Sequence, residues 1–126
     1  MRYDIWFVLV AFICLLAGEA MGIWMGAAFD FTLAPVHAHI NLLGWVTLAL
    51  YGIMHHIYPA LGKSKLAMIQ FLAAIVSVPL MGLSLAFFLM GNQAALVPLS
   101  ISEVVIVLAT VLFLAMFWLH VARAKT

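Results

Sequence analysis

Charged residues are scarce in this chain. Five Lys and Arg and four Asp and Glu make up only 7% of the 126 residues, whereas soluble domains contain about a quarter charged residues. So few charges cannot form the polar shell of a soluble fold. A net charge of +1 gives no basic surface, which excludes nucleic-acid binding. The single cysteine, Cys14, excludes an internal disulfide and a cysteine-rich zinc site.

Apolar residues are abundant, at 69% of the chain, and they form four long runs. The runs cover residues 5–28, 36–58, 66–90 and 95–121. A membrane span needs about 20 apolar residues, and lipid leaves helices or closed barrels as the only spanning structures. Runs of this length predict an all-α, polytopic membrane protein with four transmembrane helices, folded as a single domain over residues 1–126.

The basic residues predict the orientation of these helices. With four spans, the N-terminus, the second loop and the C-terminus share one side of the membrane. That side contains every basic residue of the chain: Arg2, Lys63, Lys65, Arg123 and Lys125. The positive-inside rule therefore predicts cytoplasmic termini, in the inner membrane of a prokaryote. A cleaved signal peptide is the less favoured interpretation of residues 1–28, because apolar character continues too far beyond Glu19.

Ionisable residues inside the predicted spans are costly and mark candidate functional sites. Glu19, His37, His39 and Glu103 all fall in the outer half of the membrane. Both carboxyl groups could be neutral and hydrogen-bonded to a neighbouring helix, or could relay protons. The remaining histidines, at positions 55, 56 and 120, lie at the inner ends of spans and are expected to be interfacial.

The spacing of His37 and His39 places the two imidazoles about 200° apart on a regular helix. Either one of them is in a loop, or the helix serves two sites. The face of His37 continues through Asn41, Gly44, Leu48, Tyr51 and His55. The opposite face continues from His39 through Leu42, Leu43, Val46, Leu50 and Ile53. An imidazole above an apolar wall is the arrangement that a haem requires.

Glycines at positions 18, 22 and 26 form a ridge on the first predicted helix. Such a ridge allows close approach of a second helix, which is the favoured interpretation, or of a flat macrocycle. A site for free zinc, iron or manganese, built from His37 or His39 with Glu19 and Glu103, is an alternative. The divergence of the two imidazoles requires that such a site combine several subunits.

The segment 37–59, and above all the run His-Ala-His-Ile-Asn-Leu-Leu-Gly-Trp at 37–45, resembles the second helix of haem–copper oxidase subunit I. More specifically, it is similar to small four-span proteins related to the cbb3-type catalytic subunit. The resemblance implies cytoplasmic termini and a haem ligand near the outer end of this helix. It also implies a homotrimer that mimics the twelve helices of subunit I, and closed cyclic symmetry is normal for oligomers.

The resemblance further implies a cofactor and a set of site residues. His37 and His39 would be axial ligands of iron in haem b, held noncovalently because the chain has no Cys-x-x-Cys-His motif. Further residues expected to line the haem are Asn41, Gly44, Gly18, Gly22, Glu19 and Glu103. The histidines for a copper centre are missing, so oxygen reduction by this chain alone is not expected.

The expected function is electron transfer with a redox partner, or binding of a small gas such as O2 or NO. The first alternative is a small oligomeric transporter that conducts protons or metal ions, and the second is a structural subunit of a respiratory complex. Whether His55, His56 or His120 holds a second haem is left open.

Overall fold

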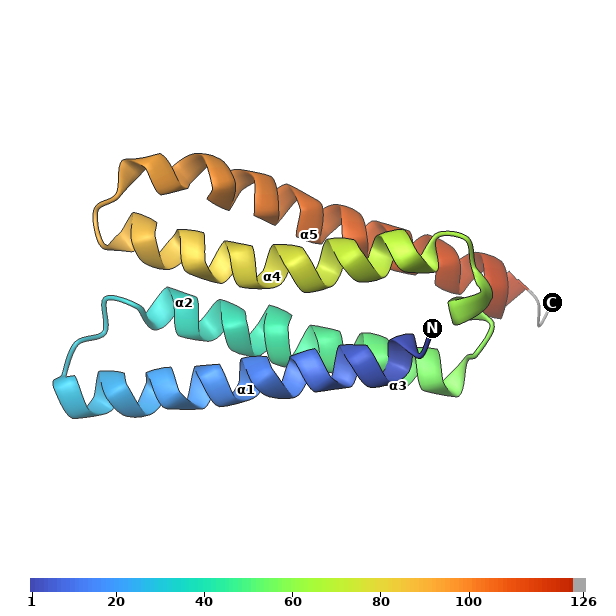
Figure 1. Ribbon diagram of the computed structural model, residues 1–126, viewed down its shortest axis with the longest axis horizontal. Helices are drawn as coiled ribbons and strands as arrows, with labels where there is room; N and C mark the ends of the chain where they lie inside the picture. The colour runs from blue at the N-terminus through green and yellow to red at the C-terminus, as the bar shows by residue number, and fades with distance from the viewer. Residues whose placement is uncertain (124–126) are drawn as a thin grey trace.

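The computed structural model describes residues 1–123, and its elements are all helical (Figure 1). Helix α1 covers Tyr3–Ala28, and the second long helix consists of α2 (Ala34–His39), η1 (Ile40–Thr47) and α3 (Leu48–Ile57). A short turn, η2 (Leu61–Lys63), leads to α4 (Ala67–Leu89). The last long helix consists of η3 (Gln93–Ala95), α5 (Leu96–Phe117) and η4 (Trp118–Ala122).

Four of these helices are long and apolar enough to cross a membrane: Tyr3–Ala28, Ala34–Ile57, Ala67–Leu89 and Gln93–Ala122. Each lies within a few residues of one predicted run. The prediction of an all-helical chain with four membrane-length helices is therefore confirmed. The chain is a multi-pass membrane protein by this criterion.

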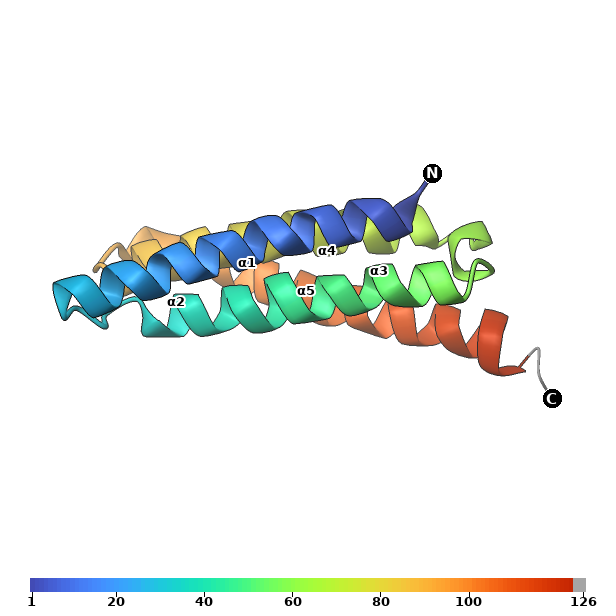
Figure 2. The same cartoon turned by 90° about the horizontal axis from the view of Figure 1, so that it is seen from below.

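The helices form two antiparallel hairpins, α1 with the second long helix and α4 with α5 (Figures 1 and 2). The N-terminus, η2 and the end of η4 lie at one end of the bundle. We call this the basic end, because its residues include Arg2, Lys63, Lys65 and Arg123. The α1–α2 and α4–α5 connections lie at the other end, which we call the opposite end. As predicted, the basic residues of the described chain share one end.

Local chemistry defines the connections at the opposite end. Phe29 ends α1 in the left-handed region, with φ 52°. The Asp30 carboxylate then accepts a hydrogen bond from the Thr32 N–H at 3.0 Å, and hydrogen bonds from the Thr32 side chain and backbone lower the pKa of Asp30. In the second connection, Gly91 has a φ of +96°, and the Asn92 side chain accepts from the Ala94 N–H. Both turns fall in the predicted gaps.

The second long helix contains a π-helical segment, η1, directly after His39. Within it, the Thr47 hydroxyl donates to the Leu42 carbonyl at 2.8 Å. Segments of π-helix are rare and are frequent at functional sites. The wider turn also changes which residues face inward, because Leu43 packs against the core although the regular pattern placed it on the opposite face.

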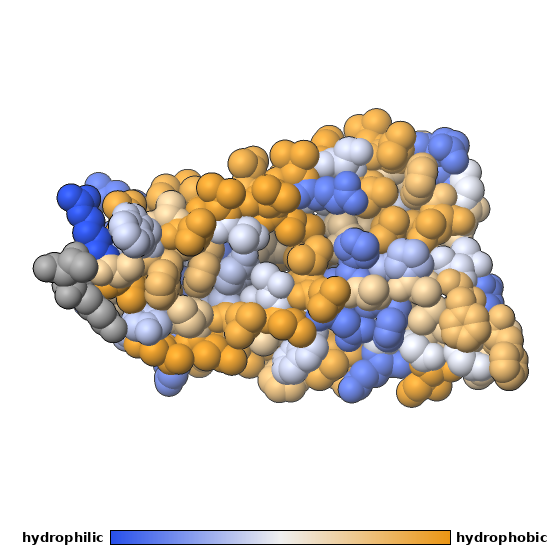
Figure 3. Space-filling model, turned by 180° about the vertical axis from the view of Figure 1, so that it is seen from behind, coloured by the Kyte–Doolittle hydropathy of each residue, from blue (hydrophilic) through white to orange (hydrophobic). Residues whose placement is uncertain are grey.

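Most side chains of the bundle face outward. In the most apolar window of each long helix, only 17–33% of residues are buried. Large apolar residues such as Ile13, Ile23 and Leu114 are at least 65% exposed. Figure 3 shows apolar side chains over most of one face, interrupted by hydrophilic ones in the half away from the termini. A surface this apolar suits lipid or a further subunit rather than water.

Candidate functional site

His37 lies between α2 and α1. Its Nδ1 is 2.9 Å from the carbonyl oxygen of Gly18. A Cβ placed on Gly22 would come within 3.1 Å of the His37 Cε1, so the ring packs directly on the glycine ridge. Because a carbonyl oxygen only accepts, Nδ1 carries the proton and Nε2 keeps its lone pair.

Asn41 extends this contact by one turn. Its Nδ2 donates to the His37 carbonyl at 2.9 Å and lies 3.4 Å from Nδ1 and 3.5 Å from Nε2 of the His37 ring. A Cβ on Gly18 would meet the Asn41 amide at 2.6 Å. Gly44, farther along, faces Cys14 and Val78. Helix packing therefore accounts for Gly18, Gly22 and Gly44, and a role for them beside a cofactor stays a prediction.

His39 points away from the bundle. Its Nδ1 is 2.7 Å from the Pro35 carbonyl oxygen, so Nδ1 again carries the proton and Nε2 is left with its lone pair. The ring is exposed. Toward the basic end follow four outward side chains that are 42–62% exposed: Leu42, Val46, Leu50 and Ile53. We call His39 with these four residues the His39 face.

The predicted divergence of the two imidazoles is confirmed. Both residues belong to α2, so neither is in a loop. His37 is half-buried against α1 and His39 is exposed. The structure therefore excludes a loop position for either residue, and that the helix serves two sites stays a prediction.

Glu19 and Glu103 are both exposed on the outer surface of the bundle, on α1 and α5. Among residues 1–123, neither carboxylate has a hydrogen bond or an ion pair. The same residues contain no group of three or more His, Cys, Asp or Glu side chains that could hold a metal ion. Within one copy of the described chain, neither carboxylate therefore lies in a cluster with the histidines or bonds to a neighbouring helix.

The histidines near the basic end differ from one another. His56 is exposed and its Nδ1 lies 3.2 Å from the Asp4 carboxylate, and His120 is also exposed. These two fit the interfacial interpretation. His55 does not, because it is only 5% exposed. The one sequence signal for its burial was its position on the His37 face of the second long helix.

Comparisons of the chain with protein-family models, with curated proteins and with solved structures find no match. The resemblance of segment 37–59 to haem–copper oxidase subunit I therefore stays a prediction. The evidence for or against a haem site therefore comes from the geometry of the side chains.

Proposed function

We propose that this chain is a haem b-binding membrane protein, a minimal relative of oxidase subunit I, that transfers electrons or binds a small gas. The observation that supports this most is shared by His37 and His39. Each imidazole donates its Nδ1–H to a backbone carbonyl, at 2.9 and 2.7 Å. Histidines that ligate metals usually make this bond, because it fixes the ring and leaves Nε2 as the ligand atom.

His39 fits a haem better than His37 does. Its Nε2 faces outward above the apolar side chains of the His39 face, which remain uncovered in a single copy. The His37 ring, by contrast, is held in the α1–α2 contact with the Asn41 amide near its Nε2. On this proposal, the His39 Nε2 would hold the haem iron. His37 would ligate a haem only if α1 and α2 separated locally.

A homo-oligomer would complete the site. The His39 face, Glu19 and Glu103 are all outward-facing in one copy, and ionisable groups facing lipid are costly. A second copy on the His39 face would cover the apolar wall and exclude lipid from the ring. We propose a trimer, on the resemblance to subunit I, in the inner membrane of a prokaryote with cytoplasmic termini.

Haem b in this position would supply reversible one-electron chemistry at iron, or would bind a small gas. The chain would contribute the Nε2 ligand, and the Pro35 carbonyl would hold the His39 ring in place through Nδ1. The apolar wall would exclude water and so affect the potential of the iron. Glu19 and Glu103, which face outward on α1 and α5, would act on the haem of a neighbouring copy, where they would tune its potential or accept a proton.

The test is the visible spectrum of the purified protein, with haem per subunit from a pyridine haemochromogen assay. The wild-type chain is expected to show a Soret band with resolved α and β bands. The variant His39→Ala should lose most of the haem, and His37→Ala should lower the haem content or shift the spectrum. His56→Ala is the matched control, since His56 is exposed at the basic end, and it should keep the wild-type spectrum. Full haem in both His37→Ala and His39→Ala would refute the assignment.

The alternative is a small oligomeric transporter for protons or metal ions. The exposed positions of Glu19 and Glu103 favour it, because such carboxylates mark ion pathways when subunits enclose them. Under this alternative the purified protein is colourless. Proteoliposomes then take up protons or a divalent metal, and Glu103→Gln abolishes the uptake.

A further inference from the structure

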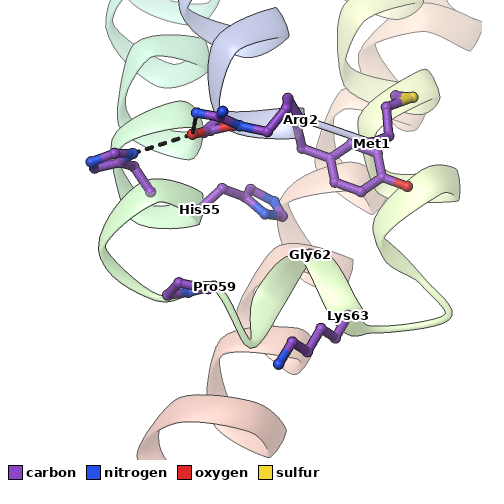
Figure 4. A pocket seen from close by; sticks show the side chains of 9 residues that line it. Met1, Arg2, His55, Pro59, Gly62 and Lys63 are labelled. Atoms are coloured by element: carbon purple, nitrogen blue, oxygen red, sulfur yellow. Dashed lines mark hydrogen bonds and ion pairs between the residues drawn. The ribbon is translucent and has the colours of Figure 1, made fainter.

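A cavity opens at the basic end of the bundle, between the start of α1, the end of α3 and the η2 turn (Figure 4). Its volume is about 400 Å3, and its lining includes Arg2, Asp4, His55, Gly62 and Lys63. The cavity lies at the ends of the membrane-length helices, where lipid headgroups and water meet. It lies at the other end of the second long helix from His39, and its chemistry is independent of a haem.

The imidazole of His55 is the unusual group of this cavity. The residue is only 5% exposed, and within the described chain neither Nδ1 nor Nε2 has a hydrogen-bond partner. The rings of Phe7, Tyr3 and Phe113 surround it, with centroid distances of 5.7, 5.6 and 6.1 Å. Buried polar groups are nearly always paired, so an unpaired one requires an explanation.

The side of the His55 ring that faces Gly62 is not covered by an aromatic side chain. A Cβ built on Gly62 would lie 3.9 Å from the His55 Nδ1 and 3.6 Å from the Tyr3 Cδ2. Figure 4 shows the His55 side chain reaching from α3 into the cavity toward Gly62. A neutral imidazole has one N–H donor, so an acceptor bound in the cavity would satisfy it.

The charges of the cavity favour an anion. Asp4 is the one acidic residue of its lining, and its carboxylate already pairs with Arg2 at 3.0 Å and with His56 at 3.2 Å. The Lys63 ammonium has no ion pair among residues 1–123. A cation would find no free carboxylate here, whereas an anion would meet an unpaired ammonium and a buried N–H donor.

We propose that this cavity binds a phosphate group, supplied either by a lipid headgroup or by free phosphate. His55 donates its ring N–H to one phosphate oxygen, and Lys63 supplies the compensating charge. Basic pockets at the membrane surface recognise lipid headgroups by this chemistry. Gly62 adds no side chain on the Nδ1 side of the His55 ring, where a Cβ would lie 3.9 Å from Nδ1.

The experiment uses the full chain with 15N-labelled histidine, purified in a maltoside detergent that contains no phosphate. The His55 ring signals, assigned by their loss in His55→Phe, are followed while inorganic phosphate or dihexanoylphosphatidylglycerol is added at constant ionic strength. Saturable shifts of the His55 signals are expected. Saturation by the lipid alone identifies a headgroup site, and saturation by inorganic phosphate identifies a site for the free ion. No shift with either ligand would overturn the proposal.

Two variants and a matched control test the contacts. Lys63→Ala removes the unpaired charge, and Gly62→Ala places a methyl group before His55 at ordinary contact distances, so the fold is expected to survive. Each should weaken binding at least tenfold. Lys65→Ala removes the same charge from the same loop but outside the lining of the cavity, and it should change the Kd less than twofold. Equal weakening by Lys63→Ala and Lys65→Ala would show unspecific attraction and contradict the assignment.

Discussion

Two histidines separated by one residue acquire different surroundings because their neighbours differ. His37 meets Gly18 and Gly22, whose missing side chains leave room for the ring between two helices. His39 is exposed and bonds to the carbonyl of Pro35 within its own helix. The same Nδ1 bond therefore leaves one Nε2 inside the bundle and the other outside it. This difference explains why the two positions are unequal as candidate ligands.

Gly52 provides a residue-scale prediction for the packing of α1 on α3. A Cβ at this position would lie 2.9 Å from the backbone oxygen of Asp4 and 2.7 Å from the Val8 Cγ2. Because backbone must move, Gly52→Ala should destabilise the protein by about 1–3 kcal/mol. The measurement is reversible unfolding of the purified protein in mixed micelles of detergent and SDS.

Gly26→Ala is the control for this substitution. It lies on α1 with nothing within 4 Å of the added Cβ. Removing glycine from a helix interior should leave stability unchanged or raise it by about 0.5–1 kcal/mol. Equal destabilisation by Gly52→Ala and Gly26→Ala would contradict the close α1–α3 contact.

Asp30 gives a prediction of pH dependence in the α1–α2 connection. Hydrogen bonds from Thr32 lower the pKa of its carboxyl group. A lowered folded-state pKa stabilises the turn above the unfolded value of about 3.9, and that contribution is lost as the pH falls through the folded value. A carboxyl 13C titration should place the pKa of Asp30 below 3.8, and in Thr32→Pro, which lacks the N–H, it should return toward the ordinary value.

At the scale of elements, the sequence predicted the long helices well and the π-helical segment not at all. Hydropathy over some twenty residues is enough to locate a span, because the bilayer sets its length. The π-helix of η1 depends on a local balance of hydrogen bonds to backbone carbonyls, such as the bond from the Thr47 hydroxyl to the Leu42 carbonyl, which no hydropathy pattern encodes. Sequence spacing therefore placed His37 and His39 correctly but placed Leu43 on the wrong face.

The π-helical segment leads to a prediction at this scale. Deleting Ala49 from the regular helix α3, directly after η1, while η1 keeps its wider turns, would rotate α2 against the rest of α3 by about 100°. His39 would then no longer stand above Leu50 and Ile53. We expect the helical content from circular dichroism to be unchanged while haem content falls sharply.

Thr47→Val is the length-preserving control for this deletion. It removes only the bond to Leu42, so it should cost about 0.5–1.5 kcal/mol of stability and retain haem. A deletion variant that keeps all its haem would show that the register between His39 and the apolar wall is unimportant.

At the scale of the whole molecule, the sequence alone predicts which segments share an end of the bundle. It does not predict which helix faces pack against each other. The shared basic end follows from an even number of spans and the positions of Arg2 and Lys63. Which faces pack against each other depends on small steric differences, such as Gly18 against Asn41. The burial of His55 is of the same kind, since it requires aromatic rings from α1 and α5 together.

The proposed oligomer can be tested on the His39 face itself. A photoreactive phenylalanine analogue at position 50, which is 53% exposed, should crosslink neighbouring copies in membranes. Because such a probe reacts with whatever it touches, it detects the head-to-tail contacts of a cyclic trimer, which pairs of identical cysteines would miss. A ladder of bands that ends at three subunits is expected, with the same mass by native mass spectrometry. The same probe at position 76 of α4, 60% exposed, is the control for lipid-facing positions and should give monomers. Monomers from both positions would show that lipid, rather than a second copy, covers the His39 face. The proposed haem site would then lack the second subunit that it requires.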